Sequence, residues 1–187
     1  MQIRKAKVED SAGLARVQVD SYQTTYAGIF PQSYLDCFSY EEQEGDWQDL
    51  LLSELEDVLY VAETDAGEIV GYVLGRPGPS EIPPYDSELV ALHVRHSHQR
   101  RGIGRQLVAT MAAQLKQREC ASLMLWVLEK NPSRLFYERM GAQLLDGRNV
   151  SVGGAVEVAY GWPDIESLSR SDFARPVHAA GAVAPLQ

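Results

Sequence analysis

The chain has 187 residues, 45% of them hydrophobic, so a single domain can bury a sizeable core. A formal net charge of −9 argues against a nucleic-acid-binding protein, and no apolar run is long enough for a membrane span or a secretory signal. The two cysteines, Cys37 and Cys120, fit buried thiols better than a disulfide, which predicts a reducing compartment and a cytoplasmic protein.

The first half of the chain predicts one strand, a group of helices and a hairpin. A helix begins at Asp10 or Ser11, and Ser39 with Glu42 forms a capping box for a later helix. In chain order the predicted elements are a strand at residues 3–7, helices at 11–27, 31–38 and 40–55, and strands at 58–63 and 69–74.

The second half alternates strands and helices. A Pro-rich loop at residues 76–84 leads to a central strand at 87–94. The elements that follow are a helix from 105 to about 118, a strand at 122–128, a short helix from 132, and strands at 142–145 and 155–160. We therefore expect one domain over residues 1–164 and a flexible tail over 165–187, where no apolar periodicity is found.

The most informative segment connects the central strand to the next helix. Residues 99–104 read Gln-Arg-Arg-Gly-Ile-Gly, and the glycines permit a tight turn before a helix whose free N–H groups and dipole favour an anion. Residues 89–118 hold six Lys or Arg side chains and no Asp or Glu, although the whole chain is acidic. This segregation predicts a phosphate-bearing ligand. A tight turn without a ligand is the alternative for so short a motif.

Two motifs carry a resemblance to a known family. Residues 99–104 match Q/R-x-x-G-x-G/A, whereas the chain has no P-loop and lacks the third glycine of a dinucleotide fingerprint. Residues 125–142 run from a strand through an asparagine into a short helix that carries Phe-Tyr-Glu and ends at Gly141, with Ala142 where the family usually has phenylalanine. In this order and spacing, the motifs resemble the GNAT superfamily of acetyl-CoA-dependent N-acyltransferases over about residues 3–162.

The resemblance implies an α/β (α+β) fold. Its central, mixed, mostly antiparallel twisted sheet is flanked by helices, and a splayed central strand pair forms the acetyl-CoA cleft. Pantetheine is expected along the central strand and pyrophosphate at the turn, without a metal. The residues implied for acetyl-CoA binding are Leu92, His93, Val94, Gln99, Arg100, Arg101, Gly102, Ile103, Gly104, Arg105 and Asn131. Asn131 could equally cap the short helix, and both roles can hold together.

Acetylation of an amine requires a neutral amine, and hence a base or desolvation. Glu88 starts the central strand eleven residues before the turn motif, where the family places a general base. Strand alternation puts Glu88 on the face of Val90 and Leu92, and a carboxylate at the edge of the sheet is the structural alternative. His93 is a competing base on the opposite face, with an exposed or hydrogen-bonded histidine as its alternative.

The leaving thiolate requires a proton. Tyr137 matches the family's general acid by its place in the Phe-Tyr-Glu sequence, and a neutral phenol can donate at pH 7. The alternative is a core aromatic residue at helical spacing.

The acceptor site is the least defined part of the prediction. The aromatic residues that the resemblance places around it are Tyr22, Tyr26 and Phe30, with Tyr34, Tyr160 and Trp162 as further candidates. Residues 17–75 contain thirteen Asp or Glu and no Lys or Arg, which would attract a cationic acceptor. A solvated acidic surface that keeps the protein soluble is the alternative.

The sequence thus predicts an N-acetyltransferase that moves the acetyl group of acetyl-CoA to a primary amine of a small molecule or peptide by direct attack in a ternary complex. A non-catalytic acyl-CoA-binding or sensing module is the alternative, and it would need neither Glu88 nor Tyr137. Nucleic-acid and membrane partners are not expected, and a homodimer stays open.

Overall fold

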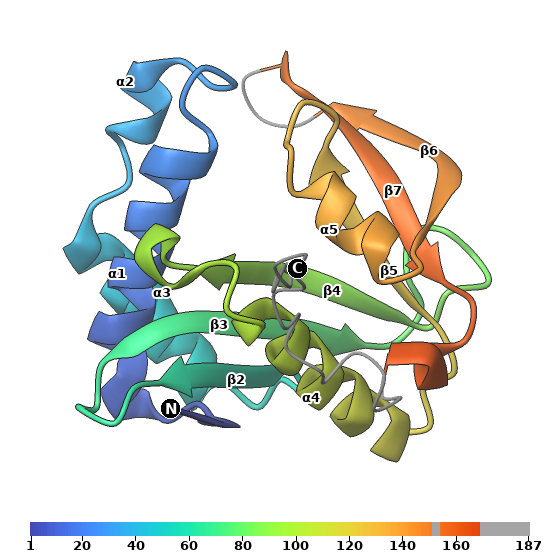
Figure 1. Cartoon of the computed structure of the whole chain (residues 1–187), viewed down its shortest axis with the longest axis horizontal. Coiled ribbons are helices and arrows are strands. Elements are labelled where there is room, and N and C mark those ends of the chain that lie inside the picture. The colour runs from blue at the N-terminus through green and yellow to red at the C-terminus, as the bar shows by residue number, and fades with distance from the viewer. Residues whose placement is uncertain (151–153, 169–187) are drawn as a thin grey trace, which may run out of the picture.

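The computed structural model describes residues 1–150 and 154–168, and these form a seven-stranded sheet flanked by helices (Figure 1). The strands lie in the order β1-β2-β3-β4-β5-β7-β6. Their bounds are β1 Gln2–Lys5, β2 Val58–Glu63, β3 Ile69–Pro77, β4 Ser87–Val94, β5 Leu123–Leu128, β6 Gln143–Val150 and β7 Val156–Trp162. Neighbours are antiparallel except β4 and β5, which are parallel. This confirms the predicted mixed, mostly antiparallel sheet.

The parallel pair β4 and β5 separates along its length. Among the described residues, Glu88 and Met124 are the one registered pair between these strands, near the N-terminal end of each. Beyond this pair the strands diverge toward Val94 and Leu128, so the sheet opens as a wedge with its apex at Glu88 and Met124 (Figure 1). The splayed central strand pair is therefore confirmed.

Helices cover both faces of the sheet. Their bounds are α1 Ser11–Thr25, α2 Gln32–Leu35, α3 Tyr40–Leu52, α4 Ile103–Gln117 and α5 Arg134–Arg139. On one face, α1 and α3 bury Leu14 and Trp47 against Tyr72 of β3. On the other face, α4 and α5 bury Leu107 and Tyr137 in one continuous core. The two faces of the sheet thus have separate apolar cores. The wedge between β4 and β5 is a gap in the sheet itself, so it can be reached from both faces.

Side-chain hydrogen bonds hold the apex of the wedge together. The carboxylate of Asp86 accepts the backbone N–H groups of Ala121 and Ser122 at 2.9 and 2.8 Å, and the Ser122 hydroxyl at 2.8 Å. The hydroxyl of Ser87 donates to the carbonyl of Ser122. Burial alone would raise the pKa of Asp86, but these hydrogen bonds outweigh it and hold the pKa below its ordinary value. The start of β4 is therefore fixed to the start of β5.

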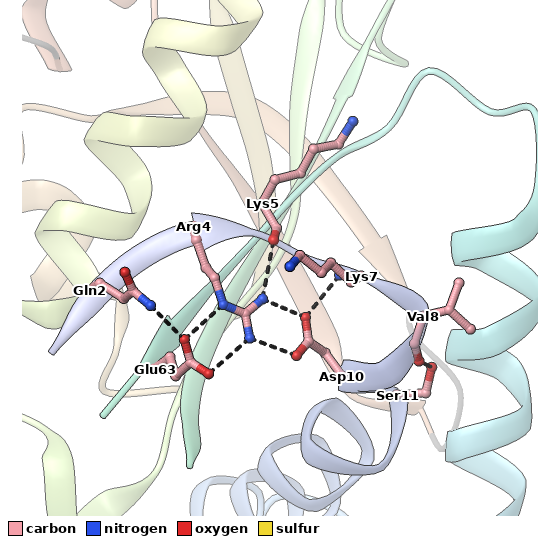
Figure 2. Close-up of polar contacts among 8 residues, drawn as sticks. All are labelled: Gln2, Arg4, Lys5, Lys7, Val8, Asp10, Ser11 and Glu63. Carbon is pink, nitrogen blue, oxygen red and sulfur yellow. Dashed lines mark hydrogen bonds and ion pairs between the residues drawn. The ribbon is translucent and has the colours of Figure 1, made fainter. Parts of the chain in front are cut away.

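Arg4 ties β1 to β2 and to the start of α1 (Figure 2). Its guanidinium donates to Asp10 at 2.7 and 2.8 Å and to Glu63 at 2.8 and 3.1 Å. Gln2 also donates to Glu63, and the backbone N–H of Lys7 donates to Asp10. The hydrogen bonds from Arg4 lower the pKa of Asp10, and those from Arg4 and Gln2 hold the pKa of Glu63 at about 2. The edge strand is thus anchored by charged pairs as well as by its ladder.

Local sequence signals in the helical region were reliable at helix starts and less so at helix ends. Ser39 caps α3, because its hydroxyl oxygen accepts the Glu42 N–H at 3.1 Å. The helix ends at Leu52, three residues before the predicted end. Both cysteines are free, but only Cys120 is buried, so the prediction of a buried thiol is wrong for Cys37.

The folded domain extends past the predicted boundary at residue 164. Residues Ile165–Leu168 form a 3-10 helix in which Ile165 and Leu168 are buried in the α4 core. The N–H of Ile165 donates to the carbonyl of Ala121 at 2.9 Å, and Lys116 forms an ion pair with Glu166. The first four residues of the predicted tail therefore belong to the domain, and its remainder, residues 169–187, lies outside the described residues.

Candidate active site

A cavity of about 210 Å³ occupies the wedge between β4 and β5. Residues 89–94 of β4 and 126–128 of β5 line its sides. Tyr22 of α1 and Tyr26 at the C-cap of α1 reach it from one face of the sheet, and Tyr137 of α5 reaches it from the other. The cavity is therefore accessible to groups from both faces, which is the arrangement that two reacting molecules need.

Hydrogen bonding between β3 and β4 decides which backbone groups of β4 face the cavity. The N–H of Arg95 donates to the carbonyl of Val70 at 2.9 Å, in register with the β3–β4 ladder. Hydrogen-bonded pairs alternate in an antiparallel ladder, so His93 bonds to its partner Tyr72 in the same way. The backbone of His93 is thus occupied by β3, contrary to the expectation that it pairs with pantetheine.

The backbone groups of Leu92 and Val94 point instead toward β5 and the cavity. Gln99 Nε2 donates to the carbonyl of Val94 at 3.0 Å, which agrees with this direction. Within the described residues, the N–H groups of Leu92 and Val94 have no acceptor. An extended ligand could pair with this edge as an added strand.

The turn between β4 and α4 presents a second set of free backbone groups. Arg100 and Gly102 adopt left-handed conformations, with φ of 63° and 82°, and α4 begins at the buried Ile103. In the part of the chain that the structure describes, no acceptor reaches the N–H groups of residues 100–105. These free N–H groups and the positive end of the α4 dipole are arranged to favour an anion, and we refer to residues 100–105 as the anion-binding turn. That a ligand binds there stays a prediction.

The side chains of this turn have different surroundings. Arg101 donates to the carbonyl of Ser97 at 3.0 Å, whereas Arg105 has no side-chain partner among the described residues. Gly104 lies beside α5, since a Cβ at this position would be 3.4 Å from Cζ of Phe136. Gly102 therefore shapes the turn, and Gly104 permits close packing of α4 and α5.

Tyr137 and Asn131 reach the cavity from the segment after β5. Tyr137 is 7% exposed and packs against Trp162, with ring centroids 6.3 Å apart. Burial raises the pKa of Tyr137 well above its ordinary value, so its hydroxyl is protonated at neutral pH. Asn131 Oδ1 accepts the N–H of Ser133 at 2.8 Å. The N-cap of α5 is Ser133, so the prediction that Asn131 caps this helix is wrong, and the Asn131 side chain instead closes a turn just before the helix. Its contact with a ligand stays a prediction.

A β-bulge at Val90 changes the face on which Glu88 lies. Val90 has no registered partner on β3, although its neighbours on both sides do. Because of this extra residue, Leu89 and Leu92 both pack into the α4 core, and Glu88 lies on the opposite face together with His93. The prediction that Glu88 shares a face with Leu92, and that His93 points the other way, is therefore wrong.

Glu88 lies at the apex of the wedge and is not among the residues that line the cavity. Its carboxyl group is half-buried. Burial raises the pKa of Glu88, the guanidinium of Arg76 opposes this effect, and the carboxylates of Glu81 and Asp57 add to it. The net increase makes Glu88 a stronger proton acceptor than an exposed glutamate.

His93 lines the cavity and packs between two tyrosines. Its ring centroid lies 5.5 Å from that of Tyr22 and 5.4 Å from that of Tyr72. Burial lowers the pKa of His93 to about 4, so the imidazole is neutral at pH 7.

Tyr22 of α1 and Tyr26 at its C-cap line the cavity, as expected for an acceptor site, with ring centroids 4.9 Å apart. Phe30 and Tyr34 continue this aromatic cluster behind Tyr26 and do not line the cavity. The structure therefore places two of the expected aromatic residues at the site and excludes two from its wall.

Tyr160 and Trp162 also lie away from the cavity, in the core beneath α5. The hydroxyl of Tyr160 donates to Glu138 at 2.6 Å, and Nε1 of Trp162 donates to the carbonyl of Met140 at 2.8 Å. These contacts give both residues a structural role in holding α5 on the sheet.

Glu157 lines the cavity, and the sequence did not single it out. It lies on β7 opposite Leu128, on the face that α2 covers, and burial raises its pKa. Glu157 is the one acidic residue in an otherwise uncharged strand, which is a local signal that could have drawn attention to it. The sequence predicts a helix at residues 31–38, but it does not show that this helix packs over the face of the sheet that carries Glu157.

The described residues contain no group of three or more His, Cys, Asp or Glu side chains that could hold a metal ion. Across residues 1–150 and 154–168, no helix has the length and apolar character that crossing a membrane requires.

Similarity to known proteins assigns this architecture to a family. The model of the acetyltransferase (GNAT) family matches residues 20–142, and the chain therefore belongs to this family. It is 37% identical over 168 residues to the uncharacterized N-acetyltransferase YuaI of Bacillus subtilis (strain 168), covering 89% of this chain and 95% of that protein. The chain is thus an N-acetyltransferase of the GNAT family.

More distant relatives include proteins of named activity. The spermidine N(1)-acetyltransferase of Thermoplasma acidophilum is 24% identical over 153 residues, which cover 78% of this chain and 90% of that protein. The crystal structure of the PaiA N-acetyltransferase of Thermoplasma acidophilum in complex with coenzyme A superposes with a TM-score of 0.69. That alignment covers 86% of this chain and 98% of the other at 21% identity, so it shows a shared fold.

Proposed function

We propose that this chain transfers the acetyl group of acetyl-CoA to a primary amine of a small molecule or peptide, by direct attack in a ternary complex. The observation that carries the proposal is the cavity in the wedge between β4 and β5, which groups from both faces of the sheet line. The anion-binding turn belongs to the α4 side, and Tyr22 and Tyr26 belong to the α1 side. Donor and acceptor can therefore meet in one cavity.

Acetyl-CoA is the donor in this proposal. Its pyrophosphate would accept from the free N–H groups of residues 100–105, with Arg100 and Arg105 as charge-assisted partners. Pantetheine would pair with the free edge of β4 at Leu92 and Val94. These are mainly backbone contacts, so they depend on the conformation of the chain more than on side-chain identity.

Two side chains would move protons during transfer. The amine nitrogen attacks the acetyl carbonyl carbon, and the C–S bond then breaks. Glu88 would accept the proton of the amine through a bridging water, because its carboxylate lies at the apex outside the cavity wall. Tyr137 would donate its hydroxyl proton to the leaving thiolate, since it lines the cavity in the protonated state.

The acceptor is proposed to be cationic. Residues 17–75 carry thirteen acidic and no basic side chains, and the two tyrosines offer cation–π faces. The similarity to a spermidine N(1)-acetyltransferase adds support for a polyamine or another amine with positive charge.

The test measures thiol release from acetyl-CoA with a thiol-reactive dye in the presence of polyamines, amino acids, aminoglycosides or peptides. We expect release above hydrolysis with at least one class of amine. In Tyr137→Phe, turnover should fall by about a hundredfold while acetyl-CoA affinity changes little, because only the proton donor is lost. Silence across the panel, or an unaltered chemical step in Tyr137→Phe, would contradict the transfer or the acid assignment respectively.

A further inference from the structure

Glu157 is an isolated charge inside the cavity. It is the one Asp, Glu, Lys or Arg among the described residues that line this space. Its carboxylate has no hydrogen bond or ion pair with the part of the chain that the structure describes, although the residue is half-buried. A partly desolvated carboxylate without a partner is costly, and a bound cation is the ligand that offsets this cost.

The surroundings of Glu157 also suit a cation. The hydroxyls of Tyr22 and Tyr26 lie close enough to Glu157 for its charge to contribute, after burial, to the increase in their pKa values. Trp126 lines the same cavity. Aromatic faces next to a carboxylate form a pocket that favours an ammonium group over a neutral amine.

Glu157 lies far from the apex of the wedge, where Glu88, the proposed base, is placed. Glu157 is registered with Leu128, four residues along β5 from the apex at Met124, which corresponds to about 13 Å of strand. Leu92 lies four residues from the apex on β4. Because β7 lies one further strand spacing of about 4.8 Å beyond β5, Glu157 lies toward the open end of the wedge and away from its apex.

Tyr26 lies between the proposed acid, Tyr137, and the isolated carboxylate of Glu157. Tyr26 lines the same cavity as Tyr137 and Glu157. After burial, both of these groups contribute to the increase in the pKa of Tyr26, which agrees with its place between them. A flexible acceptor that reacts beside Tyr137 can therefore extend along Tyr26 toward Glu157.

We propose that Glu157 binds a second positive charge of the acceptor, remote from the attacking nitrogen, and so selects diamines and polyamines over monoamines. This inference rests on the proposed function for the location of the reacting end. It assigns to Glu157 a role in acceptor selection, whereas Glu88 and Tyr137 move protons.

The experiment titrates the full chain, saturated with coenzyme A, with putrescine or butylamine in a calorimeter. These amines have the same carbon chain, and only putrescine has a second ammonium group. We expect the wild type to bind putrescine about tenfold more tightly, and Glu157→Gln to reduce this preference to within about twofold. In Glu157→Asp the carboxylate lies one methylene farther back, so the preference should return and shift toward the longer cadaverine.

Glu54→Gln is the matched control. Glu54 is an exposed carboxylate outside the cavity, so its variant loses the same charge and should keep the preference of the wild type. A Glu157→Gln protein that binds coenzyme A normally and still prefers putrescine would overturn the inference, as would a wild type without preference.

Thiol release with both amines separates this inference from the proposed function. Selective binding of putrescine without thiol release from acetyl-CoA would refute transfer to this amine and leave the role of Glu157 standing. Equal kcat/KM for butylamine and putrescine in an active wild type would support transfer and refute the role of Glu157.

Discussion

Burial shifts the pKa values of the titratable side chains around the wedge in opposite directions. It raises the pKa of Tyr137 and of Glu88, and it lowers the pKa of His93 to about 4. At pH 7 the phenol is therefore protonated and the imidazole neutral. The site thus offers a proton donor on the α5 side and proton acceptors on the α1 side, where the amine would enter.

The pH dependence of turnover tests whether Glu88 is the base. A base works when it is deprotonated, so activity should fall as pH decreases through the raised pKa of Glu88, above the ordinary value of about 4.3. Glu88→Gln should lower kcat and remove this acidic limb from a profile of kcat against pH. If the limb remains in Glu88→Gln, the base is another group, and His93 is the candidate that lines the cavity.

Glu81→Gln provides a control that moves the limb without removing it. The carboxylate of Glu81 contributes to the raised pKa of Glu88, so its neutralisation should shift the acidic limb to lower pH and leave the plateau rate unchanged. Glu81 lies in the loop between β3 and β4. A loss of plateau activity in Glu81→Gln would show that this loop affects catalysis by a route other than the pKa of Glu88.

The hydrogen bonds and ion pairs of Arg4 with Asp10 and Glu63, here called the Arg4 network, should contribute to stability. Arg4→Met leaves the mostly buried carboxylate of Asp10 without its partner, and the free energy of unfolding at pH 7 should fall by about 2 kcal/mol. The folded-state pKa values of Asp10 and Glu63 are lowered, so their contribution is present above the ordinary carboxyl pKa of about 4. It is lost as pH falls toward about 2, the pKa of Glu63 in the folded protein. Urea unfolding of wild type and Arg4→Met should therefore converge at acidic pH.

Lys116→Met is the comparison for this experiment. Lys116 and Glu166 form an exposed ion pair, whose loss should change the free energy of unfolding by less than about 0.5 kcal/mol. A similar loss in both variants would mean that the Arg4 network contributes no more than a surface pair.

At the scale of elements, the contact between α1 and β3 depends on Gly13. A Cβ at this position would lie 2.8 Å from Cγ1 and 3.0 Å from Cβ of Ile69. Gly13→Ala gains about 1 kcal/mol of helix propensity but overpacks the interface at a cost of about 1–3 kcal/mol. We expect a net loss of about 1 kcal/mol in the free energy of urea unfolding. Gly45 in α3 faces open space, so Gly45→Ala is the control and should raise the free energy of unfolding by about 0.5–1 kcal/mol. If Gly13→Ala and Gly45→Ala change this free energy equally, Gly13 is not closely packed against Ile69.

Elements with strong local signals could be predicted from the sequence. The central strand was predicted at residues 87–94, where β4 lies, because its apolar run ends at the turn motif. Ser39 was a reliable helix start because the capping contact involves a residue only three positions away. The tight turn before α4 could be predicted for the same reason, since its glycine and the start of the helix are adjacent in the chain.

The features that depend on distant contacts could not be predicted. The bulge at Val90 follows from the register between β3 and β4, and it reverses the face of Glu88. Phe30 was expected at the cavity, but the packing of the aromatic cluster places it behind Tyr26. Glu157 was missed because only the tertiary arrangement brings β7 next to the wedge.

At the scale of the whole molecule, the wedge divides the sheet into two parts that meet at the apex. One part is β1-β2-β3-β4 and the other is β5-β7-β6 (Figure 1). Asp86, Ser87 and the Glu88–Met124 register hold the apex, whereas the open end has no such link between β4 and β5 in the described residues. A ligand that lies in the wedge would touch both parts and should stabilise the domain as a unit, by about 2.7 kcal/mol at a hundred times its Kd.

Hydrogen exchange of single amides, followed by NMR, tests how acetyl-CoA would lie in this wedge. The amides of Leu92 and Val94 point into the cavity without acceptors, whereas the amide of His93 is bonded to β3. Acetyl-CoA should therefore slow exchange at Leu92 and Val94 by about tenfold or more and leave His93 protected as before. Adenosine diphosphate carries the pyrophosphate but no pantetheine, so it should protect only amides of residues 100–105. If acetyl-CoA leaves Leu92 and Val94 in fast exchange, the ligand does not pair with the edge of β4, and the anion-binding turn alone holds it.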